Sequence, residues 1–257
     1  ATDQVVSLNS VSILPPTRPT KMIGLWNNFH AAAEKNGLAV PEKPLYLIKP
    51  PSCFLGHGGT IRQPAAYDGR IFYEGELGVV IGRECAAVPE EEASDYIFGY
   101  TCINDVTALK LINEDPAFPQ WTRAKSFDTF GPFGPTVATG LDPMDLTVKT
   151  VLNGRERQNY PVSDMIFPPQ VLVSRLSHDM TLLPGDLIAC GTSLGVLPMK
   201  SGSTVEVVIE GIGTLPVDLG LACFQDGCGC HGFQFLVCGF RFSVQGSTVY
   251  GTNRVHR

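Results

Sequence analysis

The segment Ile71-Phe72-Tyr73-Glu74-Gly75-Glu76-Leu77-Gly78-Val79-Val80-Ile81 carries two carboxylates inside an otherwise apolar run. The run predicts a strand that enters the hydrophobic core. Residues two apart in a strand point to the same face, about 6–7 Å from each other, so Glu74 and Glu76 face one space. Two unpaired buried carboxylates raise each other's pKa, and a divalent cation between them would neutralise both. The alternative is an edge strand whose glutamates face water.

A third acid follows the next apolar stretch. Residues 96–103 form that stretch, and Asn104-Asp105 ends it, which places a carboxylate at the end of a second predicted strand. Three carboxylates outweigh the charge of one divalent ion, so a cationic side chain close by would balance the site. Lys125 is the candidate for that role. The alternative is that Lys125, which precedes a loop, is a solvated surface residue.

Several motifs, in this order, resemble the fumarylacetoacetate hydrolase family, in its small bacterial-type branch of acylpyruvate hydrolases and 2-hydroxyhepta-2,4-diene-1,7-dioate isomerases. They are Tyr-Glu-Gly-Glu-Leu at 73–77, Asn-Asp-Val-Thr-Ala at 104–108, Lys-Ser-Phe-Asp-Thr-Phe-Gly-Pro at 125–132 and Pro-Gly-Asp-Leu-Ile-Ala-Cys-Gly-Thr-Ser at 184–193. The resemblance covers most of the chain before residue 215. It implies a mainly β (α+β) fold, a mixed β-sandwich roll with a small N-terminal domain.

The resemblance also implies the chemistry of the acidic residues. It assigns the metal ligands to Glu74, Glu76 and Asp105, and the catalytic lysine to Lys125. Oxygen ligands suit a hard divalent ion. We therefore expect Mg²⁺, with Mn²⁺ and Ca²⁺ as alternatives.

Substrate contacts are implied at Gly191 and Thr192. The chain departs from the family at Leu109, where many relatives have an arginine that helps to hold a substrate carboxylate. An anionic substrate would then be held by the metal, by Lys125, by Arg123 and by backbone N–H groups near Gly191 and Thr192. A second anionic group on the substrate would be absent or bound in another way.

The segment 24–30 resembles the part of the family in which a histidine closes over the site from a mobile lid, and here that histidine is His30. Relatives often place a glutamate three residues later to form a dyad, but this chain has Ala33 there and Glu34 one residue on. A helix over residues 28–35 would put His30 and Glu34 on one face. They form either a catalytic dyad or a surface contact, which is typically worth about 0.2–0.5 kcal/mol.

Length and composition fit one large β-rich domain with a small appendage, because 257 residues with 44% hydrophobic and 17% charged residues can bury a sizeable core. We expect an N-terminal or lid region at 1–55, a catalytic domain at 56–215 and a cysteine-rich tail at 216–257. Short strand patterns occupy 71–81, 96–103, 136–139, 146–152, 187–190 and 205–209, and a helix lies near 163–177, interrupted by Pro168-Pro169.

The expected partner is a small-molecule 2-oxo acid. The net charge of −6 and the lack of a basic patch argue against general nucleic-acid binding. The sequence has no uninterrupted apolar run long enough for a membrane span, and the first residues lack the basic and apolar regions of a secretory signal. We therefore expect a cytoplasmic protein without membrane contacts. The resemblance implies a homodimer.

The tail holds Cys223, Cys228, Cys230 and Cys238, with His231 beside the third. Zinc binding is one interpretation, but the cluster lacks the paired Cys-x-x-Cys spacing of common structural zinc sites. We favour incidental thiols over a zinc site. The other four cysteines are expected to act as small core residues.

The predicted function is metal-dependent hydrolysis of the C–C bond of an acylpyruvate-type β-diketo acid through a metal-stabilised enolate, in aromatic-compound catabolism. His30, assisted by an acid, would deprotonate the attacking water, and Lys125 would stabilise developing negative charge. The alternative is an isomerase, tautomerase or decarboxylase that acts on a related 2-oxo or 2-hydroxy-dienoic dicarboxylate. A third hypothesis is a non-catalytic binding protein that kept the fold.

Overall fold

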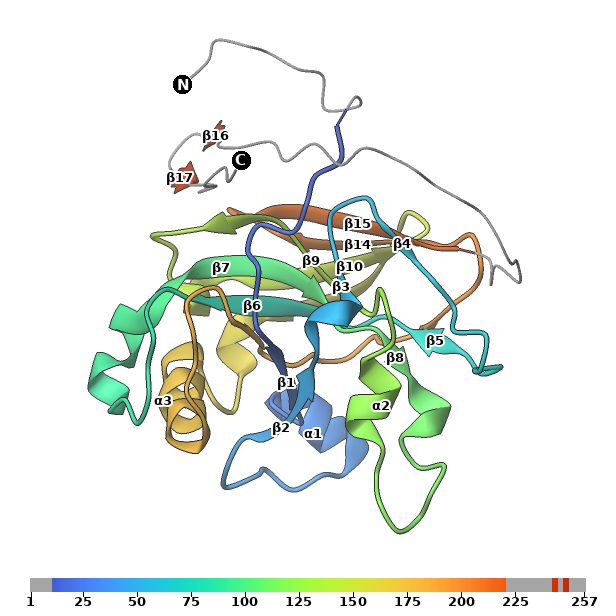
Figure 1. Ribbon diagram of the computed structural model, residues 1–257, viewed down its shortest axis with the longest axis horizontal. Helices are drawn as coiled ribbons and strands as arrows, with labels where there is room; N and C mark the ends of the chain where they lie inside the picture. Colours follow the sequence, from blue (N-terminus) through green and yellow to red (C-terminus); the bar gives the residue numbers. More distant parts are fainter. Residues whose placement is uncertain (1–10, 221–241, 245–246, 250–257) are drawn as a thin grey trace.

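The computed structural model describes residues 11–220, together with the backbone of 242–244 and 247–249 (Figure 1). Three sheets dominate it. The largest has nine strands in the order β16-β17-β9-β7-β6-β12-β1-β2, with β3 beside β9. These strands are β1 (Met22–Trp26), β2 (Leu45–Lys49), β3 (Phe54–Leu55), β6 (Gly75–Ile81), β7 (Ile97–Asn104), β9 (Gly131–Ala138), β12 (Leu187–Ala189), β16 (Phe242–Val244) and β17 (Ser247–Val249).

A second sheet of five strands has the order β11-β10-β14-β15-β4, and a third of three strands has the order β13-β5-β8. The second comprises β4 (Thr60–Ile61), β10 (Thr147–Leu152), β11 (Arg155–Pro161), β14 (Thr204–Ile209) and β15 (Gly213–Leu219). The third comprises β5 (Ile71–Phe72), β8 (Thr107–Ala108) and β13 (Pro198–Met199). Figure 1 shows the five-stranded sheet stacked on the large one.

Helical segments are short and lie around the sheets. The α-helices are α1 (His30–Asn36), α2 (Trp121–Lys125) and α3 (Pro169–Asp179), and the 3₁₀ turns are η2 (Pro51–Cys53), η3 (Glu90–Tyr96), η4 (Leu109–Leu111), η5 (Pro143–Asp145) and η6 (Val162–Asp164). Gly37 ends α1 in the left-handed conformation, φ 63°, as a C-terminal stop. Pro169 opens α3 at the first helical position, where its missing N–H costs nothing.

The core follows from the alternation of side chains along the central strand β6. Leu77, Val79 and Ile81 point into the cluster between the two larger sheets, where they meet Val148 of β10. Val80 points to the opposite face of the large sheet, into a smaller cluster. This two-sided burial confirms a mainly β fold of packed sheets.

The predicted strand over 71–81 is wrong in one respect, because two strands occupy it. Ile71 and Phe72 pair with β8 and β13, whereas β6 begins only at Gly75 and pairs with β7 and β12. The chain changes sheets between them, and the Glu74 carbonyl accepts a hydrogen bond from the Asp105 N–H, 2.8 Å. β6 is an interior strand and Glu76 is fully buried. The edge-strand alternative for Glu76 is therefore excluded.

Strands from the expected N-terminal region and from the expected tail belong to the same sheets as strands of the expected catalytic domain. β1 pairs in parallel with β12 and in antiparallel with β2, so residues 22–49 extend the large sheet. β15 continues the five-stranded sheet through Leu219. The β16–β17 hairpin pairs with β9 through Val249 and Ala138. The cysteines and histidine of the predicted tail cluster lie outside the described residues.

The remaining cysteines, Cys53, Cys85, Cys102 and Cys190, are buried free thiols, which confirms them as small core residues. Among the described residues, no helix has both the length and the apolar character that a bilayer span requires.

Asp186 fastens the chain before β1 to the start of β12. Its carboxylate accepts hydrogen bonds from the Thr20 N–H, 2.8 Å, the Leu183 N–H, 3.0 Å, and the side chain of Lys21. Burial alone would raise the pKa of Asp186, but these hydrogen bonds outweigh it and hold the pKa below its ordinary value. The carboxylate therefore stabilises the position of β1, the strand that leads into α1.

We expect Asp186→Asn to lower the free energy of unfolding by about 2 kcal/mol, because hydrogen bonds to a charged acceptor are lost. Since the folded-state pKa is depressed, the contribution is complete above the unfolded value of about 3.9 and disappears as the pH falls through the folded value. Urea unfolding between neutral and acid pH measures both effects. Asp95→Asn, in an exposed ion pair with Arg83, is the control and should change little. Equal losses in the two variants would contradict the prediction.

Candidate metal centre

Three carboxylates converge at the point where the large sheet meets the three-stranded sheet. Glu74 precedes β6, Glu76 lies within it and Asp105 follows β7. The register of β6 and β7 pairs Gly75 with Asn104, which brings the three acids side by side. One oxygen from each lies within 4.8 Å of the others, and within the described residues no second group of three such ligands forms.

The cluster fits a divalent cation. Oε2 of Glu76 accepts a hydrogen bond from the Gly191 N–H, 2.8 Å, but its buried Oε1 has no hydrogen-bond partner. Burial, followed by the negative charges of Asp105 and Glu74, raises the pKa of Glu76 well above its ordinary value. A buried carboxylate oxygen without a partner is costly. Oxygen ligands of this kind suit Mg²⁺, Mn²⁺ or Ca²⁺.

Lys125, at the end of α2, lies in the centre of the cluster as predicted. Its Nζ donates hydrogen bonds to Asp105 Oδ2, 2.7 Å, Glu74 Oε2, 2.9 Å, and Thr107 Oγ1, 2.7 Å. Burial alone would lower the pKa of Lys125, but the surrounding carboxylates outweigh burial and raise it. The side chain is therefore a fixed ammonium donor.

A second lysine in the site, Lys49, was missed in the sequence. It is fully buried on β2, and its Nζ donates to Asp105 Oδ1 and to the Phe130 carbonyl, 2.8 Å. Burial alone would raise the pKa of Asp105, but Lys125 and Lys49 outweigh burial and hold it below its ordinary value. The available signal was the strand pattern Leu-Tyr-Leu-Ile-Lys at 45–49, in which Lys49 shares a face with Leu47.

The segment with Gly191 and Thr192 lies against the acidic motif. Thr192 Oγ1 donates to the Gly75 carbonyl, 3.0 Å, and accepts from Gln158 Nε2, 2.8 Å. Gly191 has φ +91°, and a Cβ there would lie 3.2 Å from Asn28 Cβ. Its N–H is bonded to Glu76, so in this arrangement it supports a predicted metal ligand. The roles of Gly191 and Thr192 in substrate binding stay predictions.

The predicted lid residues His30 and Glu34 and the predicted substrate-binding residue Arg123 lie at the surface. His30 and Glu34 are exposed, and within residues 11–220 no hydrogen bond joins their side chains. Asn28, two residues before His30, is buried and donates to the Cys190 carbonyl, 2.8 Å, next to Gly191. Arg123 is exposed and ion-paired with Glu114, 2.7 Å. The structure thus brings together the acids and Lys125 but not His30, Glu34 or Arg123, whose roles stay predictions.

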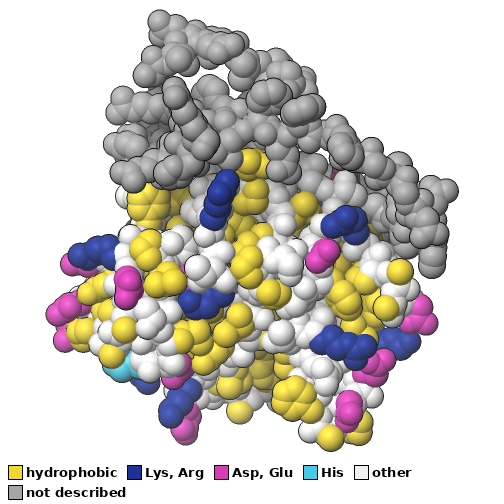
Figure 2. Space-filling view, in the orientation of Figure 1, with side chains coloured by type: hydrophobic (Ala, Val, Ile, Leu, Met, Phe, Trp, Pro, Cys, Tyr) yellow, Lys and Arg dark blue, Asp and Glu magenta, His cyan; other side chains and the backbone are white. Residues whose placement is uncertain are grey.

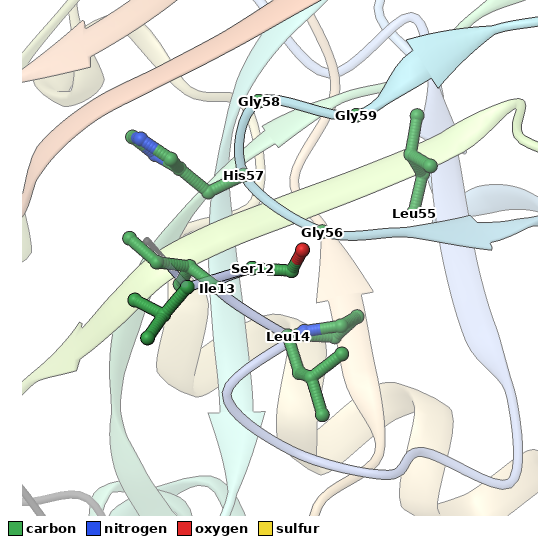
Figure 3. Close-up of a pocket in the computed structure, with 10 residues that line it drawn as sticks. Ser12, Ile13, Leu14, Leu55, Gly56, His57, Gly58 and Gly59 are labelled. Carbon is green, nitrogen blue, oxygen red and sulfur yellow. The ribbon is translucent and has the colours of Figure 1, made fainter. Parts of the chain in front are cut away.

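A hollow of about 380 Å³ lies elsewhere, between residues 11–15 and 55–59 (Figure 3). Ile13, Leu14 and His57 are among the residues that line it. No carboxylate lines this hollow, and none of the residues of the acidic cluster does. The hollow is therefore separate from the acidic cluster.

We expect Glu76→Gln to abolish stabilisation by a divalent metal while leaving the metal-free fold intact, because a neutral amide replaces a carboxyl group that burial already disfavours as an anion. For the wild-type protein, metal at 100 times its Kd should add about 2.7 kcal/mol to the free energy of unfolding. Thermal unfolding with and without Mg²⁺ or Mn²⁺ measures this. Glu156→Gln, at an exposed position of β11, is the matched control. A metal-induced shift that survives in Glu76→Gln would place the ion elsewhere.

We expect Lys49→Met to cost about 3–5 kcal/mol of unfolding free energy without metal, because it leaves the buried carboxylate of Asp105 short of a partner. Urea unfolding of metal-free protein provides the value. Lys149→Met, exposed on β10, should be nearly neutral. A cost for Lys49→Met as small as that of the control would show that Lys125 alone balances the cluster.

Comparison with known proteins agrees with this geometry. Residues 21–219 match the family described as "Fumarylacetoacetate (FAA) hydrolase C-terminal". A 5-carboxymethyl-2-hydroxymuconate delta-isomerase from Mycobacterium smegmatis, solved by X-ray crystallography, is 41% identical in sequence to this chain. The structural alignment covers 85% of this chain and 86% of the isomerase chain, with a TM-score of 0.77. Both the sequence and the fold are therefore similar to those of an isomerase.

Two further relatives differ in their named reactions. A mitochondrial oxaloacetate tautomerase of Arabidopsis thaliana is 38% identical over 78% of this chain and 91% of its own. A fumarylpyruvate hydrolase of Pseudomonas aeruginosa, solved with Mn²⁺ and pyruvate, is 27% identical over 80% of this chain and 91% of its own, with a TM-score of 0.74. Because the family match spans residues 21–219 and relatives at 41% and 38% identity each align with more than three quarters of the chain, the protein belongs to the fumarylacetoacetate hydrolase family.

Proposed function

We propose that this protein is a divalent-metal-dependent enzyme that forms an enolate from a small 2-oxo acid, and that it hydrolyses the C–C bond of an acylpyruvate-type acid. The observation that carries the proposal is the cluster of buried Glu76 and Asp105 and partly buried Glu74 around Lys125. A passive scaffold has no need for three converging acids. The hydrolase relative solved with Mn²⁺ and pyruvate supports the same class of ligand.

Glu74, Glu76 and Asp105 would hold the ion, which supplies Lewis-acid stabilisation of negative charge on oxygen when bound. Lys125 donates a hydrogen bond to negative charge that develops on the substrate. It cannot act as a general base while the carboxylates keep it protonated. Thr107, whose hydroxyl donates to Glu74 Oε1, 2.6 Å, and accepts from Lys125, fixes the geometry of both.

Hydrolysis also requires a base that activates water. His30 is the candidate, because α1 begins beside the segment that supports Glu76. The Asn28 side chain donates a hydrogen bond to the Cys190 carbonyl, and the N–H of the next residue, Gly191, donates one to Glu76. Closure of α1 over the site would carry His30 inward, with Glu34 as its acid partner. The distal carbonyl of the acylpyruvate would then be attacked, and cleavage would release pyruvate as its enolate.

The second candidate is keto–enol tautomerisation or double-bond isomerisation of a related 2-oxo acid. The exposed, unconnected positions of His30 and Glu34 favour it, because these reactions move a proton and need no activated water. The relatives at 41% and 38% identity carry isomerase and tautomerase names. Decarboxylation of a 2-oxo dicarboxylate passes through the same enolate and is the third outcome.

Further parts of the proposal concern the surroundings of the enzyme. We propose Mg²⁺ as the ion, with Mn²⁺ or Ca²⁺ as substitutes, and a role in aromatic-compound catabolism. We also propose a cytoplasmic homodimer without nucleic-acid or membrane partners.

The test is incubation of metal-stripped protein with an acylpyruvate, with and without Mg²⁺ or Mn²⁺, while enol absorbance and pyruvate are followed together. We expect metal-dependent pyruvate release, lost by at least about 100-fold in Lys125→Met, since one charge-stabilising donor is typically worth that factor. Loss of absorbance without pyruvate would assign tautomerisation or isomerisation. CO₂ release from a 2-oxo dicarboxylate would assign decarboxylation. Binding without turnover in every assay would favour a non-catalytic protein.

A further inference from the structure

β1 carries an aromatic side chain toward the face of the sheet that holds the metal centre. Met22, Gly24 and Trp26 are two residues apart from one another along β1 and so lie on one face of the sheet. On the neighbouring strand β2, Met22 pairs with Lys49 and Gly24 pairs with Leu47. Lys49 on that face binds Asp105. A Cβ at Gly24 would lie 3.3 Å from Asp105 Oδ2, so the missing side chain brings the backbone of β1 against the carboxylate. Trp26 is the next side chain on this face, at the solvent end of the strand.

α2 brings a second tryptophan to the same place. Trp121 lies four residues before Lys125, and residues at this spacing lie on one helix face. Lys125 reaches into the cluster, and the Trp121 ring lies 5.5 Å from the Trp26 ring at 51°. α2 contacts β2 (Figure 1). The two rings therefore meet beside the metal centre.

The ring pair is partly open to solvent. Trp26 is 37% exposed, and Trp121 is half-buried. Figure 2 shows hydrophobic side chains on the surface in the region where Figure 1 places β2 and α2. Aromatic faces of this kind bind planar or apolar groups, and the binding is most favourable when the bound group is itself an aromatic ring.

The charge of the centre argues for a substrate with a single carboxylate. Three carboxylates and two lysines leave one negative charge, which a divalent ion converts to one positive charge, and one substrate carboxylate then neutralises it. Position 109 is a leucine, 48% exposed. The cations on the neighbouring segments, Lys110 and Arg123, are ion-paired with Asp68 and Glu114. Neither Lys110 nor Arg123 is therefore an unpaired cation beside position 109 for a second carboxylate.

We infer that Trp26 and Trp121 form the subsite for the distal end of the substrate, and that this end is an uncharged aromatic or large apolar group. The inference rests on the proposed function, because the 2-oxo acid end must bind at Glu74, Glu76 and Asp105. The substrate class is then a monocarboxylate such as an aroylpyruvate. Trp26 and Trp121 act as specificity residues and take no part in proton transfer.

The test uses three stable 2-oxo acids with Mg²⁺: pyruvate, phenylpyruvate and 2-oxoglutarate, which has a distal carboxylate. Calorimetry measures each Kd. Emission from Trp26 and Trp121, the two tryptophans of the chain, reports whether the ligand reaches the rings. We expect phenylpyruvate to bind at least about tenfold more tightly than the other two.

Trp26→Ala and Trp121→Ala should lose that preference while their affinity for pyruvate and their stabilisation by Mg²⁺ stay unchanged. Trp26→Phe and Trp121→Phe should retain most of it. Phe98→Ala, at an exposed position of β7, is the matched control. If an alanine variant does not fold, Trp121→Phe still leaves Trp26 as the sole reporter, and phenylpyruvate must change its emission.

Tighter binding of 2-oxoglutarate than of phenylpyruvate would overturn the inference but leave the proposed function standing. An equal loss of affinity for pyruvate and phenylpyruvate in Trp26→Ala would do the same. Absence of binding by all three acids to protein that Mg²⁺ still stabilises would overturn the proposed function and the inference with it.

Discussion

The convergence of three carboxylates at one point, two of them buried and one partly buried, is the constraint on which the rest of the structure depends. Anions this close together are tolerated in a protein interior only when cations and hydrogen bonds compensate them. Lys49 and Lys125 do so from two different segments, one on β2 and one on α2, and both bind Asp105. The charges thus hold the N-terminal strands, the central strands and α2 in one arrangement. The net negative charge that remains suits a divalent ion.

The five-stranded sheet packs against the Glu74-Gly75-Glu76 segment. A Cβ at Gly75 would lie 2.0 Å from Thr150 Oγ1, so only glycine allows the two sheets to approach this closely between the two glutamates. Gly75 also donates its N–H to Gln158 Oε1, 3.0 Å, and its carbonyl accepts from Tyr160 and Thr192. Both peptide groups of the motif are therefore held by side chains. This support fixes the direction in which Glu76 points.

One centre of this kind serves several reactions, which explains why its relatives carry the names of a hydrolase, an isomerase and a tautomerase. The carboxylates and Lys125 can provide for the step that these reactions share, the accumulation of charge on an enolate oxygen. What differs is the group that moves a proton or activates water, and the group that holds the far end of the substrate. In this chain we propose that those groups are His30 of α1 and the Trp26–Trp121 ring pair, all of which are at least partly exposed to solvent.

The sequence by itself determined the central strands and the acidic residues of the cluster, because their signals are local. Apolar runs and turn residues predicted the strands near 97–104, 147–152, 187–189 and 204–209 within a few residues, and the Glu-Gly-Glu motif is conspicuous in any apolar run. β1, β2, β11 and β15 were missed. The break between β5 and β6 was missed too, because it depends on which sheet each half joins.

Only the tertiary structure decided which charges meet. Lys49 lies 56 residues before Asp105, and the strand pattern around it indicates a shared face with Leu47 but not the carboxylate that it meets. The exposure of His30 and Glu34 and the pairing of Trp26 with Trp121 likewise depend on how α1 and α2 pack on the sheet. Local patterns specify which face a side chain takes, but the register between distant strands specifies what it meets there.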